Sequence, residues 1–382
     1  MGKRFIVLDG FRGAFALIVA LYHFKPGPGL VGKTLLIANG WFFVDFFFVL
    51  SGFVIFYNYS KMSRSEEQLS FLYKRFLRLY PLHFGILLAF LVFEILKYFL
   101  YSSGHFSNPP FQDENFVSFL ANIFLVQSYG LSIPALEHLS WNTPSWSISA
   151  EFFSYIVFCF TIPIINRLKV SGQLLTFLVF SLASLVFLII ANDGSTSLKI
   201  GAHFGIFRCS YSFFLGCFAC ILFNEVSWYQ PSTPTRNMVI LFTIAEISIL
   251  CLSILMVCYL PYNYSYIAPV AFFFCIFIFS FELGWLSGVL NNPFTQKLGT
   301  LSYSIYMVNA LITVFFEILL LRVVKIKSPL LYDLMIIPYL TVIYLVSLVT
   351  YQYLEVKGKV VLQNWIEKTK KRLVTSTVTN NR

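Results

Sequence analysis

Apolar runs of about 20 residues, each long enough to cross roughly 30 Å of hydrocarbon, recur from one end of this chain to the other. Only 12% of the 382 residues are charged, whereas a soluble domain usually carries about a quarter. The sequence therefore predicts an all-α protein, a polytopic bundle of transmembrane helices in a lipid bilayer. One continuous bundle is expected rather than a set of soluble domains.

The apolar runs define ten predicted spans, at residues 5–24, 38–57, 79–101, 147–166, 172–191, 202–223, 238–259, 264–283, 300–321 and 332–353. If the further apolar stretch 116–131 crossed as well, a loop without Lys or Arg would face the cytosol. The positive-inside rule instead predicts that this stretch lies in, or dips into, the outer leaflet.

Ten spans with both termini in the cytosol leave most of the 27 Lys and Arg residues in cytosolic segments. The net charge of +10 is therefore an orientation signal and requires no nucleic-acid partner. Residues 1–355 are expected to form the membrane domain. Residues 356–382 are expected to form a basic cytosolic tail, as a surface helix followed by disorder.

The first span contains Asp9, Arg12 and His23. An ionisable side chain inside hydrocarbon costs roughly 3 kcal/mol or more, so each one needs a partner or a task. Asp9 and Arg12 are three residues apart and can pair on one helix face. Arg12 and His23 are eleven apart, about three turns, so they share a face at a separation of about 16 Å along the axis.

His23 is the candidate general base, because an imidazole titrates near neutral pH. A single His at a membrane end is more often a satisfied interfacial residue. Asp45, in the outer part of the second span, favours the catalytic interpretation, because a carboxylate there could orient the imidazole of His23.

Three further charged residues are candidates. Arg75 and Arg78 are three apart at the cytosolic end of the third span, where they suit bidentate binding of phosphate; positive-inside anchoring is the alternative. Glu151 lies in the first turns of the fourth span, after Trp141 and Trp146. The tryptophans fit an interfacial aromatic belt, and the carboxylate suggests a polar ligand or a proton relay.

Other reactive side chains are assigned to packing. Ser51 and Gly52 form a small pair inside a bulky helix, which indicates close helix packing rather than a serine nucleophile. Cys217 and Cys220 lie in an apolar segment without a second Cys or His pair nearby, so they are interpreted as small core residues. The sequence predicts no metal site.

Several motifs, taken in order, resemble the membrane acyltransferase family three, the group that includes O-antigen and exopolysaccharide O-acetylases. They are Leu8-Asp-Gly-Phe-Arg-Gly13 with the Arg12 to His23 spacing, Asp45-Phe-Phe-Phe-Val-Leu-Ser-Gly-Phe53, Arg75-x-x-Arg78 before Tyr80-Pro81, Trp146-Ser-Ile-Ser-Ala-Glu151, and Leu301-Ser-Tyr-Ser-Ile-Tyr306. Together they cover about residues 4 to 355.

The resemblance implies a ten-helix acyltransferase in which His23 is the essential catalytic residue and Arg12 supports it. It also implies that the arginine pair engages an acyl-CoA donor, commonly acetyl-CoA. Asn309 stands where the last motif is often followed by His, so no catalysis is assigned there. Glu355 is followed by Val-Lys where Pro is common, which leaves the end of the tenth span open.

We therefore expect an O-acyltransferase in a bacterial cytoplasmic (inner) membrane that transfers an acyl group from acyl-CoA to a hydroxyl of a saccharide or another hydroxylated acceptor. In this mechanism the CoA phosphates bind Arg75 and Arg78, and His23 deprotonates the acceptor while Asp45 or Glu151 holds the imidazole. Direct transfer and a covalent acyl intermediate both fit these residues. The acceptor, the acyl chain length and the oligomeric state stay open.

Two alternatives compete with this interpretation. A secondary transporter would also use intramembrane charges, but it predicts repeat symmetry and broken helices in both halves, whereas the polar residues crowd into the first 151 positions. A catalytically inactive partner subunit or sensor would keep the fold. The presence of His23, Arg12, Arg75 and Arg78 together with Glu151 argues against it.

Overall fold

The computed structural model of the chain describes residues 4–24, 28–101, 109–131, 133, 139–198, 204–227 and 234–380, the last eleven of them as backbone only. The long helices are α1 (Ile6–His23), α3 (Phe43–Tyr59), α4 (Ser65–Leu100), α6 (Trp146–Ile165), α7 (Val170–Ala191), α8 (Gly205–Ser227), α9 (Arg236–Tyr259), α10 (Ala268–Phe279), α12 (Pro293–Glu317), α14 (Ile336–Thr350) and α15 (Gly358–Asn380).

Shorter helical pieces connect or extend them: η1 (Val31–Lys33), α2 (Leu35–Ala38), η2 (Gly40–Phe42), α5 (Phe116–Ile123), η5 (Thr143–Ser145), η6 (Tyr262–Ile267), α11 (Trp285–Leu290), η7 (Ile318–Val323), α13 (Pro329–Leu334) and η8 (Tyr351–Lys357). The pieces η7 and η8 are π-helical and continue α12 and α14.

Ten helical segments in the described part of the chain are long and apolar enough to cross a membrane. One segment corresponds to each predicted span, so the predicted all-α bundle of about ten spans is confirmed. Their outward faces carry exposed apolar side chains, such as Val186, Phe187 and Ile190 of α7, which suit contact with lipid tails. The 8-residue helix α5 is too short to cross, because a span needs about 20 residues.

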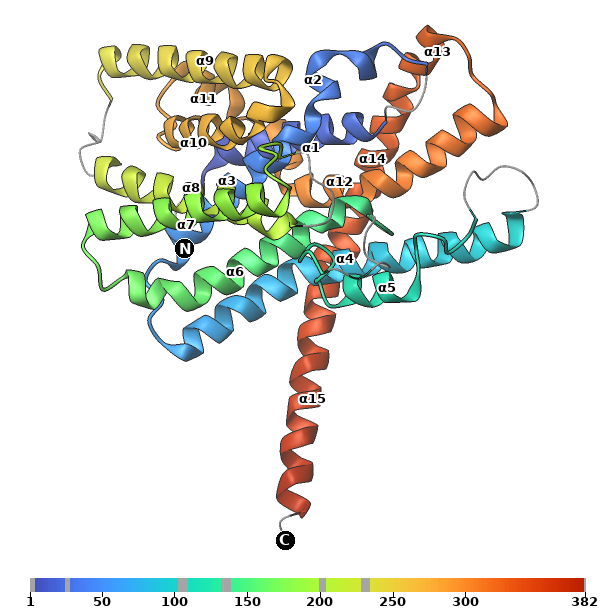
Figure 1. The fold of residues 1–382 in the computed structure, drawn as a ribbon, viewed down its shortest axis with the longest axis horizontal. Helices are drawn as coiled ribbons and strands as arrows, with labels where there is room; N and C mark the ends of the chain where they lie inside the picture. The colour runs from blue at the N-terminus through green and yellow to red at the C-terminus, as the bar shows by residue number, and fades with distance from the viewer. Residues whose placement is uncertain are drawn as a thin grey trace.

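Helix α4 and the tail differ from their predicted extent. Helix α4 begins at Ser65, whereas residue 79 was predicted, so Arg75 and Arg78 lie within the helix rather than before it. The tail was expected to become disordered, but the described backbone is helical to Asn380. Figure 1 shows α15 extending away from the rest of the bundle.

Glycines allow two close helix crossings. A Cβ atom on Gly52 of α3 would lie 1.8 Å from the Phe213 carbonyl oxygen of α8, and one on Gly216 of α8 would lie 1.9 Å from the Val49 oxygen of α3. The close packing predicted at Gly52 is thereby confirmed. Helices α1 and α12 cross in the same way, since a Cβ on Gly299 would lie 2.3 Å from the Asp9 oxygen. These crossings hold α1, α3 and α12 around the interior of the bundle.

Candidate functional site

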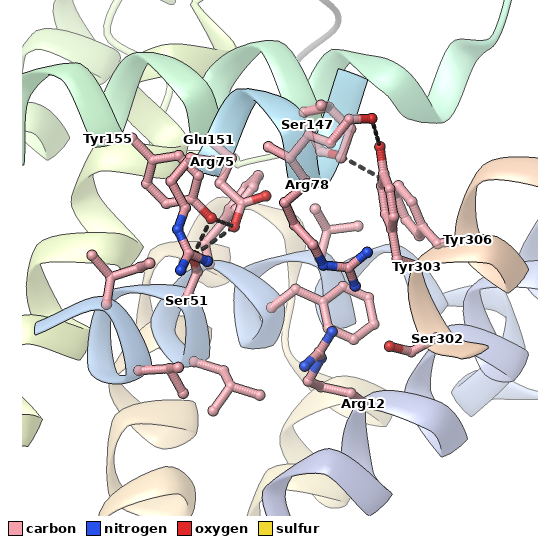
Figure 2. Close-up of a pocket in the computed structure, with 18 residues that line it drawn as sticks. Arg12, Ser51, Arg75, Arg78, Ser147, Glu151, Tyr155, Ser302, Tyr303 and Tyr306 are labelled. Carbon is pink, nitrogen blue, oxygen red and sulfur yellow. Dashed lines mark hydrogen bonds between the residues drawn. The ribbon is translucent and has the colours of Figure 1, made fainter. Parts of the chain in front are cut away.

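A cavity of about 200 Å³ lies inside the bundle, between α1, α3, α4, α6 and α12. Helix α3 supplies much of its apolar wall. The polar lining is drawn in Figure 2: Arg12, Ser51, Arg75, Arg78, Ser147, Glu151, Tyr155, Ser302, Tyr303 and Tyr306. The structure thus brings together four of the six predicted site residues, namely the three arginines and Glu151. His23 and Asp45 do not line this cavity.

Glu151 projects from the first turns of α6 toward α3. Its Oε1 accepts hydrogen bonds from the Ser51 hydroxyl at 2.5 Å and from the Tyr155 hydroxyl at 2.6 Å, and the two hydroxyl oxygens are 3.0 Å apart. Tyr155 follows Glu151 by four residues, so the two side chains share one face of α6. The sequence interpretation missed both hydroxyl partners, although the Tyr155 spacing was a readable signal.

Arg78 is held by a carboxylate from the far end of the chain. Its guanidinium pairs with Glu355 of η8, and Glu355 also accepts a hydrogen bond from Ser304 of α12 at 2.5 Å. The guanidinium carbon lies 5.3 Å from the centre of the Tyr303 ring, within cation–π range. Sequence reasoning had noted Glu355 only as the end of a motif, without a partner.

Arg75 has no ion-pair partner in the described part of the chain. Its Nη2 donates to the Tyr59 hydroxyl at 2.9 Å, and its guanidinium carbon lies 5.0 Å from the Tyr59 ring centre and 5.9 Å from that of Phe71. Aromatic faces therefore position this arginine and leave its charge uncompensated by a direct carboxylate contact.

The predicted pair of Asp9 and Arg12 is confirmed, with 3.1 Å between Arg12 Nη1 and Asp9 Oδ1. Asp9 also accepts from Arg4 Nε at 2.8 Å, so one carboxylate is shared by two guanidiniums. The lining itself carries three guanidinium groups and one carboxylate. Asp9 and Glu355 already pair with Arg12 and Arg78, so Arg75 carries the lining charge without a direct carboxylate contact, and guanidinium groups suit the bidentate geometry of phosphate.

The expectation that Asp45 orients His23 is wrong. Asp45 is fully buried, and its two carboxylate oxygens accept from Arg208 of α8 at 3.0 and 2.7 Å. The Arg208 guanidinium lies between the rings of Trp41 and Trp146, 5.2 Å from each ring centre. A buried arginine needs a carboxylate partner, and α8 lies against α3 at this level, so Asp45 is engaged there. Glu151 is likewise engaged with hydroxyls rather than with His23.

His23 ends α1, and its Nδ1 lies 2.9 Å from the Val19 carbonyl oxygen. Because a carbonyl can only accept, Nδ1 carries the proton, and in the neutral ring Nε2 carries the lone pair. This is the tautomer that a general base requires at Nε2. The imidazole lies about 16 Å along the helix axis from Arg12, and His23 is not among the residues that line the cavity.

A family model described as "Acyltransferase domain" matches residues 5–353. "Acyltransferase MdmB" from Streptomyces mycarofaciens is 30% identical over 174 residues, which cover 43% of this chain and 40% of that protein. "Protein 2 in picA locus" from Rhizobium radiobacter is 38% identical over 101 residues, which cover 26% of this chain and 50% of the relative. The matches thus span half or less of these relatives. No solved structure matches the chain.

Proposed function

This chain belongs to the acyltransferase domain family, and from that premise we propose that it is an integral membrane O-acyltransferase. Its donor is acyl-CoA, with acetyl-CoA the first choice, and its acceptor is a hydroxyl of a saccharide or of another hydroxylated molecule. The observation that carries the proposal is the cavity in which Arg12, Arg75, Arg78 and Glu151 meet. The family match does not favour the transporter alternative.

The cavity chemistry supports a phosphorylated, partly apolar donor. Guanidinium groups bind phosphate oxygens in a fixed, charge-assisted geometry, and the apolar face of α3 suits the uncharged remainder of the molecule. Five helices contribute residues to the cavity wall, so a donor bound there contacts protein on several sides. Both chain termini and the CoA entrance are on the cytosolic side of a bacterial inner membrane in this proposal.

His23 is the proposed base for the acceptor. In direct transfer, the acyl end of the donor extends along α1 from Arg12 toward His23, and Nε2 takes the proton of the acceptor hydroxyl as that oxygen attacks the thioester carbonyl. The bond between carbon and sulfur breaks, and the leaving thiolate takes up the proton. A positioned base of this kind typically contributes a factor of about 10² to 10⁴ in rate.

Labelled acetyl-CoA supplied to membranes that contain the protein tests the donor, and the labelled product identifies the acceptor. Replacing Arg75 and Arg78 together by Gln should raise the Michaelis constant for acetyl-CoA at least about tenfold, because charged hydrogen bonds to phosphate are lost. Arg167→Gln is the matched control, since Arg167 is exposed and does not line the cavity. Equal CoA affinity in the double variant and the control would contradict a phosphate-binding role for Arg75 and Arg78.

A further inference from the structure

Ser51 faces the arginine cavity with a base already hydrogen-bonded to it. Its hydroxyl donates to Glu151 Oε1 at 2.5 Å, and Tyr155 donates to the same oxygen at 2.6 Å. A nucleophile bonded to a base, with a third group that orients the base, is the arrangement found in covalent catalysis. Figure 2 shows Ser51, Glu151 and Tyr155 together, with Arg75 beside them.

We propose that Ser51 is an acyl carrier: it accepts the acyl group from acyl-CoA as an ester and passes it on to the acceptor. This inference rests on the proposed function and deepens it, because it selects the covalent route over direct transfer. Sequence reasoning assigned Ser51 to packing alone. In the structure the packing residue is Gly52, which touches α8, while Ser51 on the adjacent face reaches α6.

The other aliphatic hydroxyls of the cavity lining lack such a base. Ser147 bonds to the Pro144 carbonyl and to Tyr306, and Ser302 donates to the Gly299 carbonyl of its own helix. Within the cavity as described, the hydroxyls in contact with a carboxylate are those of Ser51 and Tyr155. Of these, the serine is the aliphatic alcohol that can become the more reactive alkoxide.

The position of Ser51 also favours a carrier. Ser51 lines the same cavity as Arg75 and Arg78, whereas His23 does not line it. An acyl thioester that enters this cavity therefore comes within reach of Ser51 and not of His23. A covalent carrier lets CoA leave the cavity before the acceptor arrives, so the two substrates need not occupy it together.

The acylation step uses Ser51, Glu151 and acyl-CoA. Ser51 Oγ attacks the thioester carbonyl while its proton moves to the Glu151 carboxylate. The carbon–sulfur bond breaks, the thiolate takes the proton from Glu151, and CoA leaves as the free thiol. The guanidiniums that line the cavity supply positive charge for the oxyanion that forms at the carbonyl oxygen.

The second step returns the enzyme to its starting state. The acceptor hydroxyl attacks the Ser51 ester carbonyl and its proton passes to the Glu151 carboxylate. The bond between the carbonyl carbon and Ser51 Oγ breaks, and Oγ recovers the proton. In this route Glu151 takes the proton in both steps, and His23 Nε2 accepts a hydrogen bond from the incoming acceptor, so the first step does not require His23.

The experiment is acyl trapping on the full-length protein in lipid nanodiscs. Radiolabelled acetyl-CoA is added without acceptor, the reaction is quenched rapidly, and peptide mass spectrometry locates the acetyl group. We expect up to about one label per chain on Ser51 and release of a matching amount of CoA thiol. Glu151→Gln should slow labelling by about 10² or more, as expected for loss of a positioned base.

Two substitutions at Ser51 separate chemistry from folding. Ser51→Ala should lose the label, and Ser51→Cys should regain it as a thioester that neutral hydroxylamine cleaves readily. Ser154→Ala is the matched control, because Ser154 lies buried on the same helix as Glu151 but outside the cavity lining. It should be labelled like the wild type.

The variant His23→Ala separates a failure of the Ser51 carrier from a failure of the proposed acyltransferase function. The carrier route predicts that this variant still acylates Ser51 while transfer to an acceptor stops. If the wild type transfers the labelled acetyl group to an added acceptor but neither it nor His23→Ala carries label on Ser51, transfer is direct and the carrier is overturned while the proposed function stands. If the wild type neither binds nor consumes acetyl-CoA, both the proposed function and the carrier are overturned.

Discussion

Asp45 and Glu151 are both carboxylates in the first turns of membrane-spanning helices, yet the structure gives them different surroundings. Asp45 forms a buried ion pair with Arg208, whereas Glu151 faces a cavity and accepts only hydroxyl hydrogen bonds. A carboxylate bound on both oxygens by a guanidinium has little capacity left to act on a substrate. Asp45 therefore belongs to the scaffold, and Glu151 is the carboxylate available for chemistry.

Removing one partner of the Asp45–Arg208 pair should destabilise the protein. Asp45→Asn or Arg208→Gln leaves the other group buried without a counter-charge, which typically costs about 3–5 kcal/mol. Replacing the pair together, as Asp45→Leu with Arg208→Met, should recover much of the loss. Thermal unfolding of the purified protein measures each variant. Unchanged stability with lost transfer in Asp45→Asn would instead support the catalytic role that the sequence suggested.

His23→Ala should abolish acyl transfer to the acceptor while the protein still inserts and expresses. The reason is that Nδ1 is committed to the Val19 carbonyl, so Nε2 carries the lone pair that accepts a hydrogen bond from the acceptor hydroxyl. Transfer from labelled acetyl-CoA in membranes is the measurement, normalised to protein content. Retention of more than about a tenth of the wild-type turnover contradicts the assignment, since a positioned base contributes about 10² or more.

At the scale of elements, the α3–α8 crossing determines which residues face the cavity. Gly52 and Gly216 let the two backbones touch, and this contact fixes the rotation of α3 so that Ser51 faces α6. The π-helical turn η8 acts similarly at the end of α14. It places Glu355 against Arg78 and Ser304, which ties α4, α12 and η8 together. Single π-helical turns are often found at functional sites.

Adding one methyl group at the crossing should force α3 and α8 apart. Gly52→Ala puts a carbon 1.8 Å from a backbone oxygen, so the helices must move, and overpacking of this kind costs about 1–3 kcal/mol. Gly288→Ala is the control, because no atom lies within 4 Å of its added Cβ. We expect a lower midpoint of thermal unfolding for Gly52→Ala than for Gly288→Ala. Equal midpoints would mean that the glycine does not set the helix spacing.

At the scale of the whole molecule, donor and acceptor are proposed to meet from opposite sides of the membrane. Single cysteines at Ser65 and Ser107, in a variant lacking the native seven, test this with a membrane-impermeant thiol reagent on intact cells. Ser65 begins α4, and Ser107 lies outside the described residues. The proposed orientation predicts labelling at Ser107 and not at Ser65.

Labelling at Ser65 alone would show that the protein has the opposite orientation in the membrane. The α4 end nearest the arginine pair would then face away from the cytosol, where acyl-CoA is found, and the physical basis for the donor assignment would be lost. Labelling of intact and of permeabilised cells, compared side by side, shows that each cysteine is reactive when the reagent can reach it.

The ten spans and the Asp9–Arg12 pair could be predicted because both depend on local sequence. A run of about 20 apolar residues crosses a bilayer as a helix whatever surrounds it, and residues three apart on a helix are neighbours by geometry. The arginine pair was readable for the same reason, since Arg75 and Arg78 share a helix face.

The partners of these residues depend on which helices become neighbours, and only the tertiary structure decided that. Arg208 pairs with Asp45 because the glycine crossing brings α8 against α3. Glu355 pairs with Arg78, although the two residues are 277 positions apart in the sequence. Periodicity places a charge on a helix face, but the rotation and crossing of that helix determine whether the charge meets a counter-ion or a cavity. The length of each apolar run thus defined the membrane spans. Close backbone contacts between helices determined that Ser51 and Glu151 line the cavity, whereas Asp45 does not.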